Sequence, residues 1–169
     1  TGVWKLFDWF KDNPERATNR PDGTVMRYAI NSNLVPKDSL MDKFLEMSHH
    51  VPWLEVYSSC EAVGKHAEYI RDGLDWEKWL HNLERLYTEG NVKRIHMMMT
   101  INSLCLASIT EFMDEMLDFK RRHDTDSPVM SLNILRFPSF QNCAMLPKEI
   151  RQKYSDKLQK WLNFHSHQN

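Results

Sequence analysis

Strand-like and helix-like segments alternate along the chain, and this alternation constrains the fold more than any other feature. Short apolar runs with the character of strands lie at residues 25–30, 53–57, 92–100 and 130–137. Apolar residues at helical spacing precede the first run, at residues 3–12, and recur after each run. Strands that alternate with helices are typical of a parallel sheet with right-handed crossovers. The sequence therefore predicts an α/β fold with about four strand–helix units.

Local signals predict where several helices begin and end. Asp38 is a suitable N-cap for the helix after the first strand, and Gly90 is a stop signal for the helix at residues 75–87. Ser108-x-x-Glu111 has the spacing of a capping box. Pro147 is expected to start the last helix, and residues 165–169 are expected to fray.

Composition excludes several classes of protein. The chain has 169 residues, of which 41% are hydrophobic and 27% charged, which is ordinary for a globular domain. The net charge of -1 gives no support to a nucleic-acid binder, and there is no apolar run long enough to span a membrane. Three cysteines, Cys60, Cys105 and Cys143, match neither a disulfide framework nor a zinc-finger spacing. Free thiols are typical of a reducing compartment, so we expect a cytoplasmic protein.

Polar residues follow each predicted strand, where ligands bind in parallel α/β proteins. They lie at residues 31–33, 58–61, 100–102 and 136–137. Polar residues at such places also serve as turns and helix caps, so this feature alone does not identify a site. A second candidate, His96 followed by the run Met97–Met99, could hold a soft metal, but a methionine run on a buried strand is more often core.

One longer segment carries a more specific pattern. Residues 59–76 read S-C-E-A-V-G-K-H-A-E-Y-I-R-D-G-L-D-W. This segment resembles the strand-four region of radical S-adenosylmethionine (SAM) enzymes, in the SPASM-related subgroup that has a twitch domain. The family pattern there is Ser-x-Asp, a small residue and Gly, and then Glu-Tyr-x-Arg-x-Gly-x-Asp-Trp. Residues 28–33 resemble the family's third strand, and residues 132–135 and 146–150 resemble its sixth strand and the segment that follows.

The resemblance covers roughly residues 3–162 and implies a fold. The chain would be a fragment of the radical SAM type of parallel partial (β/α) barrel, running from helix two to helix six over residues 1–164. The family's cluster motif, C-x-x-x-C-x-x-C, and its Gly-Gly-Glu motif are absent from the sequence. Both would lie upstream of the first helix, and a twitch region with any auxiliary cluster would lie beyond Asn169.

The resemblance also implies roles for individual residues. Ser59 and Arg71 would contact SAM, with the Arg71 guanidinium on the methionyl carboxylate. Glu61 stands where the family has Asp, and Asn33 belongs to the Ser-Asn pair that ends the third strand. An adenine contact would fall near Leu132. The three cysteines do not match the family's ligand positions, so no metal ligand is expected in this chain.

The implied activity belongs to the intact protein. Three cysteine thiolates would hold a [4Fe-4S] cluster, at which SAM is reductively cleaved to a 5'-deoxyadenosyl radical. The reductant would be a flavodoxin or ferredoxin, and the substrate would be a peptide by analogy with SPASM relatives. The fragment alone is expected to be inactive. The alternative is a non-catalytic α/β binding or interaction module.

Overall fold

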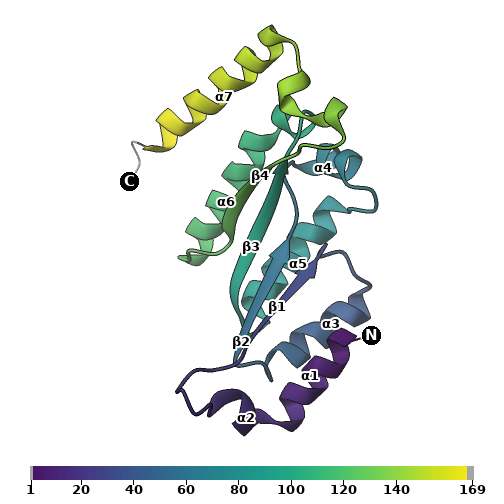
Figure 1. The fold of residues 1–169 in the computed structure, drawn as a ribbon, viewed down its shortest axis with the longest axis vertical. Coiled ribbons are helices and arrows are strands. Elements are labelled where there is room, and N and C mark those ends of the chain that lie inside the picture. The colour runs from purple at the N-terminus through teal and green to yellow at the C-terminus, as the bar shows by residue number, and fades with distance from the viewer. Residues whose placement is uncertain (1, 167–169) are drawn as a thin grey trace. The chain divides into compact units, whose positions relative to one another are not determined.

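The structure, a computed structural model, describes residues 2–166 and has mixed α/β architecture (Figure 1). The helices and strands follow one another in this order: α1 (Gly2–Asp12), α2 (Pro14–Thr18), β1 (Arg27–Ser32), α3 (Asp38–Ser48), β2 (Trp53–Ser58), α4 (Gly64–Ile70), α5 (Trp76–Thr88), β3 (Val92–Ile101), α6 (Ile109–His123), β4 (Val129–Ile134) and α7 (Lys148–Ser166). Three short 3-10 turns, η1 (Cys105–Ala107), η2 (Ser139–Gln141) and η3 (Cys143–Met145), complete the described elements. The predicted α/β class is confirmed.

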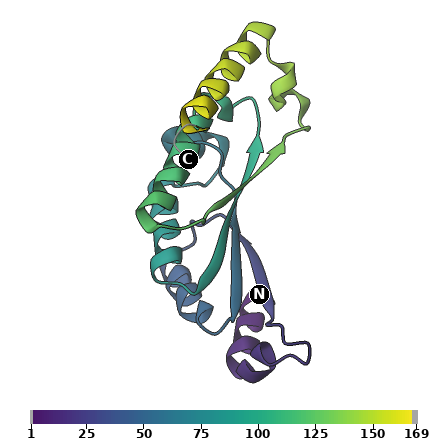
Figure 2. The same cartoon turned by 90° about the vertical axis from the view of Figure 1, so that its left-hand side faces the viewer.

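The strands form one sheet in the order β1-β2-β3-β4. β1 pairs with β2 in parallel, and β2 pairs with β3 in parallel. The register of the second pair shifts by one residue, because Leu54 lies opposite Val92 whereas Glu55 lies opposite Arg94. Lys93 is therefore an additional residue in β3. The arrows of β3 and β4 point the same way (Figure 2), and the Leu135 amide donates to the Ile101 carbonyl at 2.9 Å.

The chain divides into two compact units, which we describe separately. Unit 1 comprises residues 1–58, 74–97 and 127–129, and unit 2 comprises residues 59–73, 98–126 and 130–169. β3 and β4 each contribute residues to both units.

The core of unit 1 lies between the sheet and its helices. Alternate residues of β2 are buried, and Leu54 and Val56 are fully shielded from solvent. Figure 2 shows α3 and α5 on one side of these strands. The amphipathic helix α5 buries Trp79, whose indole nitrogen donates a hydrogen bond to Ser58 Oγ at 3.1 Å. This bond satisfies the polar atom of a large buried ring, which would otherwise cost stability.

Unit 2 is less completely covered. Helix α6 buries an apolar stripe that includes Phe112, Met116 and Phe119, whereas α7 has no buried residue. α7 is joined to α6 by polar contacts instead. Lys157 Nζ lies 2.9 Å from both carboxylate oxygens of Glu111, and Trp161 Nε1 donates to Asp114 at 2.7 Å.

Several predicted helix ends need correction. Lys37, rather than Asp38, occupies the N-cap of α3, and the Asp38 carboxylate instead pairs with Lys78 at 2.7 Å. Ser108 does occupy the N-cap of α6, as predicted, but its hydroxyl lies 2.7 Å from His66 Nδ1 and makes no capping hydrogen bond. Helix α4 was not predicted from the sequence.

The last predicted segment lies partly outside the described residues. α7 continues through Ser166, so it includes the first two residues of the segment 165–169 that is expected to fray. The other three, residues 167–169, lie outside the part of the chain that the structure describes. Among residues 2–166, no helix combines the length and the apolar character that crossing a membrane requires.

Candidate functional site

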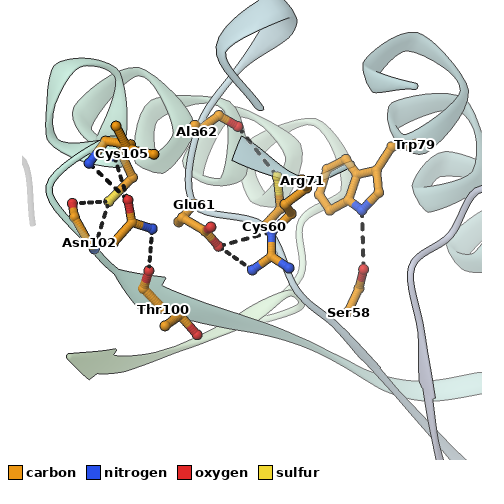
Figure 3. Close-up of polar contacts among 10 residues, drawn as sticks. Ser58, Cys60, Glu61, Ala62, Arg71, Trp79, Thr100, Asn102 and Cys105 are labelled. Carbon is orange, nitrogen blue, oxygen red and sulfur yellow. Dashed lines mark hydrogen bonds and ion pairs between the residues drawn. The ribbon is translucent and has the colours of Figure 1, made fainter. Parts of the chain in front are cut away.

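An ion pair between Glu61 and Arg71 forms the centre of the candidate site in unit 2 (Figure 3). Glu61 lies in the segment that follows β2, and Arg71 directly follows the short helix α4. The Arg71 guanidinium donates through Nε, at 3.2 Å, and through Nη2 to the same carboxylate oxygen of Glu61. Helix α4 lies between these two residues, which are ten positions apart in the sequence and meet in the fold.

The two members of the pair differ in their access to solvent. The Glu61 side chain is 3% exposed, whereas the Arg71 side chain is 28% exposed. A buried carboxylate needs a charged partner, and Arg71 supplies it. A guanidinium has five N–H donors, of which Glu61 engages one on Nε and one on Nη2. Arg71 therefore retains donors and a partly exposed surface with which to bind an anion.

Cys60 lies beside this pair in the sequence but has no reactive character. Its side chain is fully buried, and its Sγ donates to the Ala62 carbonyl at 3.4 Å. Burial raises the pKa of the Cys60 thiol to about 11, and burial also raises the pKa of Cys105 to about 12. Both thiols are neutral at physiological pH, so neither is an activated nucleophile.

The loop after β3 is built around the side chain of Asn102. Its Oδ1 accepts hydrogen bonds from the backbone amides of Leu104, at 2.9 Å, and Cys105, at 3.1 Å. Its Nδ2 donates to the Thr100 carbonyl at 3.0 Å (Figure 3). The Asn102 side chain thus bonds to two backbone amides after β3 and to a backbone carbonyl near the end of β3. This is a structural role for a buried amide.

The structure brings together only some of the predicted site residues. Ser59 is half-buried and lies two residues before Glu61, and its hydroxyl makes no hydrogen bond within residues 2–166. Leu132, on β4, is 65% exposed. Asn33 belongs to unit 1, where its Oδ1 accepts from the Val35 amide at 3.2 Å. Ser59, Glu61 and Arg71 all lie within residues 59–73 of unit 2, and we call these three residues the compact set.

The described residues do not provide a metal centre. Within residues 2–166, no group of three or more His, Cys, Asp or Glu side chains is placed to hold an ion. His96 Nε2 lies 3.3 Å from the Glu55 carboxylate but makes no hydrogen bond within residues 2–166. Met97 and Met99, which follow it, are fully buried, as expected for core residues.

Sequence reasoning named Glu61 and Arg71 but missed their direct pairing. The signal was weak, because the pairing depends on α4, a helix with only one buried residue and little apolar periodicity. No protein-family model matches this sequence, and neither the curated proteins nor the solved structures give a match.

Proposed function

We propose that this chain contributes the SAM-binding portion of a radical SAM enzyme of the twitch-domain type. The observation that carries the proposal is the partly exposed Arg71 guanidinium, which Glu61 holds in place close after Ser59 in the sequence. The sequence resemblance over residues 59–76 supplies the identity of the ligand. The finer fold type, a partial (β/α) barrel, belongs to the same proposal.

Each residue of the compact set has a defined part. Arg71 holds a carboxylate with the donors that Glu61 leaves free, since guanidinium–carboxylate pairs are strong and directional. The Ser59 hydroxyl makes no hydrogen bond to any described residue, so it can donate to or accept from a polar ligand. Glu61 is a positioning residue, because it fixes the guanidinium and does not need to touch the ligand. Leu132, also in unit 2, is a further contact in the proposal, whereas Asn33, in unit 1, remains a prediction from the sequence.

The two implied cofactors fit this chain differently. SAM, when bound at a reduced cluster, supplies the radical that abstracts hydrogen from a substrate. Ser59 and Arg71 fit its amino-acid portion. The cysteines do not fit a [4Fe-4S] cluster, because within residues 2–166 no three His, Cys, Asp or Glu side chains are grouped to hold a metal. We therefore assign the cluster ligands to flanking sequence, and the substrate, which we propose to be a peptide, remains to be identified by assay.

The decisive experiment uses the chain together with the coding sequence that flanks it. The protein is reconstituted anaerobically with iron and sulfide and incubated with SAM and a reductant, either dithionite or a flavodoxin system. We expect 5'-deoxyadenosine to form and to disappear when the cysteines of an upstream C-x-x-x-C-x-x-C motif are changed. A verified full-length protein that binds no cluster and cleaves no SAM would contradict the proposal and favour a non-catalytic interaction module.

A matched pair of variants tests the role of Arg71. Arg71→Gln should weaken SAM binding to the reconstituted protein by about tenfold, because it removes a charge-assisted contact. Iron content should not change. Arg121→Gln, on an exposed part of α6, removes the same charge and should leave SAM affinity unaltered. Equal SAM affinity in the Arg71 and Arg121 variants would remove Arg71 from the site.

A further inference from the structure

The second face of the sheet in unit 1 carries polar and aromatic side chains. We call it the open face and define it by Arg27, Trp53, Glu55, Tyr57, Arg94 and His96. These residues are register partners on neighbouring parallel strands, and such partners share one side of a sheet. Parallel sheets normally have both faces covered and apolar. A face with three charged residues is a departure that packing does not explain.

Glu55 lies at the centre of the open face, where two side chains donate hydrogen bonds to it. Trp53 Nε1 donates to one carboxylate oxygen at 2.8 Å, and the Tyr57 hydroxyl donates to the other at 3.2 Å. His96 Nε2 lies 3.3 Å from that second oxygen. The pKa of Glu55 is lowered, chiefly by the indole hydrogen bond. The carboxylate therefore stays ionised and fixes the side chains of Trp53 and Tyr57, while His96 Nε2 makes no hydrogen bond within residues 2–166.

These aromatic side chains present flat surfaces. The rings of Tyr57 and His96 stack at 4.2 Å with an interplanar angle of 5°. Arg27 lies over the Trp53 ring, with its Cζ 4.6 Å from the centroid. The residue opposite Glu55 on β1 is Ala29, whose small side chain leaves room beside the carboxylate. Rings that are already fixed lose little entropy when a planar ligand packs on them.

Neither guanidinium group of the open face pairs with a carboxylate in the part of the chain that the structure describes. Arg94 lies opposite Glu55 in the register, but Glu55 is engaged by Trp53, Tyr57 and His96. Within residues 2–166, neither Arg27 nor Arg94 forms an ion pair, and both are exposed. The open face carries two positive charges, on Arg27 and Arg94, and one negative charge, on Glu55, so it has a net positive charge. Arginine in this state is suited to bidentate recognition of an oxyanion.

We propose that the open face binds a ligand that carries an oxyanion, a carboxylate or a phosphate, on a flat unsaturated ring. Arg94 holds the oxyanion, and the ring packs beside Tyr57 and His96. Arg27 adds a second positive charge at the other end of the face. Every residue of this site belongs to unit 1, so the proposal stands independently of SAM binding in unit 2.

Simple probes test the chemistry on the unmodified chain. Benzoate and phenyl phosphate each combine a ring with an oxyanion, benzamide keeps the ring without the charge, and acetate keeps the charge without the ring. Binding is followed by titration calorimetry and by the NMR signals of the histidine rings. We expect at least one of the two charged ring probes to bind, at least about tenfold more tightly than benzamide or acetate. The tighter of benzoate and phenyl phosphate identifies the oxyanion.

Variants locate the site. Arg94→Gln should weaken binding of the preferred probe by about tenfold. Arg94→Lys, which keeps the charge but not the two parallel N–H donors, should weaken binding less. Arg20→Gln removes the same charge from an exposed loop of unit 1 and should have no effect. Benzamide binding equal to that of the charged probes, no saturable binding, or equal affinity in the Arg94→Gln and Arg20→Gln proteins would overturn the proposal.

Discussion

β2 and β4 belong to the same sheet and have six residues each, yet they differ in how far they bury their side chains. In β2 every second residue is buried, and Leu54 is completely shielded. In β4 nearly every residue is exposed, and Leu132 is 65% exposed. β2 has a neighbour on each side, whereas β4 ends the strand order. The length and apolar composition of a strand therefore do not determine how much it stabilises the fold. That contribution depends on the apolar surface that the strand removes from water.

The largest expected difference comes from one substitution made in each strand. Leu54→Ala should lower the free energy of unfolding by about 3 kcal/mol, because it removes buried methyl groups and leaves a cavity. Leu132→Ala should lower it by less than about 0.5 kcal/mol, as for other exposed positions. Urea unfolding followed by circular dichroism measures both. Equal losses would mean that β4 is covered in solution.

The next largest effect is expected at the polar segment after β2. Glu61→Gln should lower the free energy of unfolding by about 2 kcal/mol, because it weakens a buried contact with a charged partner. Combining it with Arg71→Gln in a double-mutant cycle measures the coupling between the two side chains. Additive effects of the two substitutions would show that the ion pair contributes nothing to the stability of unit 2.

A smaller, pH-dependent effect is expected on the exposed side of β2. Glu55→Gln should cost about 1 kcal/mol at pH 7, as for a weakened hydrogen-bond acceptor. Because folding lowers the pKa of Glu55, its carboxylate stabilises the native state above its ordinary pKa of 4.5. That stabilisation is lost as the pH falls through the lower, folded-state value. Urea unfolding of both proteins at pH 7 and pH 3 should show the difference shrinking in acid.

The smallest effect is expected where α7 meets α6. Lys157→Ala should cost about 0.5 kcal/mol, because exposed ion pairs contribute little, and the cost should fall further in 1 M salt. Lys160→Ala, three residues further along α7, serves as the control. Hydrogen exchange of α7 amides is the measurement. A cost of several kcal/mol would indicate that this helix depends on a single cation despite its lack of buried residues.

The order of elements was predictable because each signal is local. Helical periodicity placed α1 and α5, and the Asp75 side chain indeed accepts the Lys78 amide at the start of α5. α4 was missed because Ala67 is its only buried residue, so it lacks an apolar stripe. The Ser108 hydroxyl does not cap α6, because it lies 2.7 Å from His66 Nδ1, 42 residues away in the sequence, and interacts with that atom instead. Contacts between distant residues decide such details, and a single sequence does not display them.

The candidate sites show the same limit. A sequence pattern identified Ser59, Glu61 and Arg71. The contact between Glu61 and Arg71, however, depends on how α4, which lies between them, is folded. The open face was missed entirely, although residues 53–57, W-L-E-V-Y, place a glutamate among apolar and aromatic residues. That alternation was the available signal, because a strand covered on both sides would read as a continuous apolar run.

The additional residue in β3 has a consequence for how this region can change in length. In a regular strand, the loss of one residue turns every side chain on one side of the gap to the opposite face. In β3, Val92 and Arg94 lie opposite the consecutive residues Leu54 and Glu55 of β2, so Lys93 has no partner of its own in the register. Deletion of Lys93 would therefore leave Arg94 and His96 opposite their present partners. We therefore expect β3 to tolerate a one-residue deletion at position 93 without a change of fold.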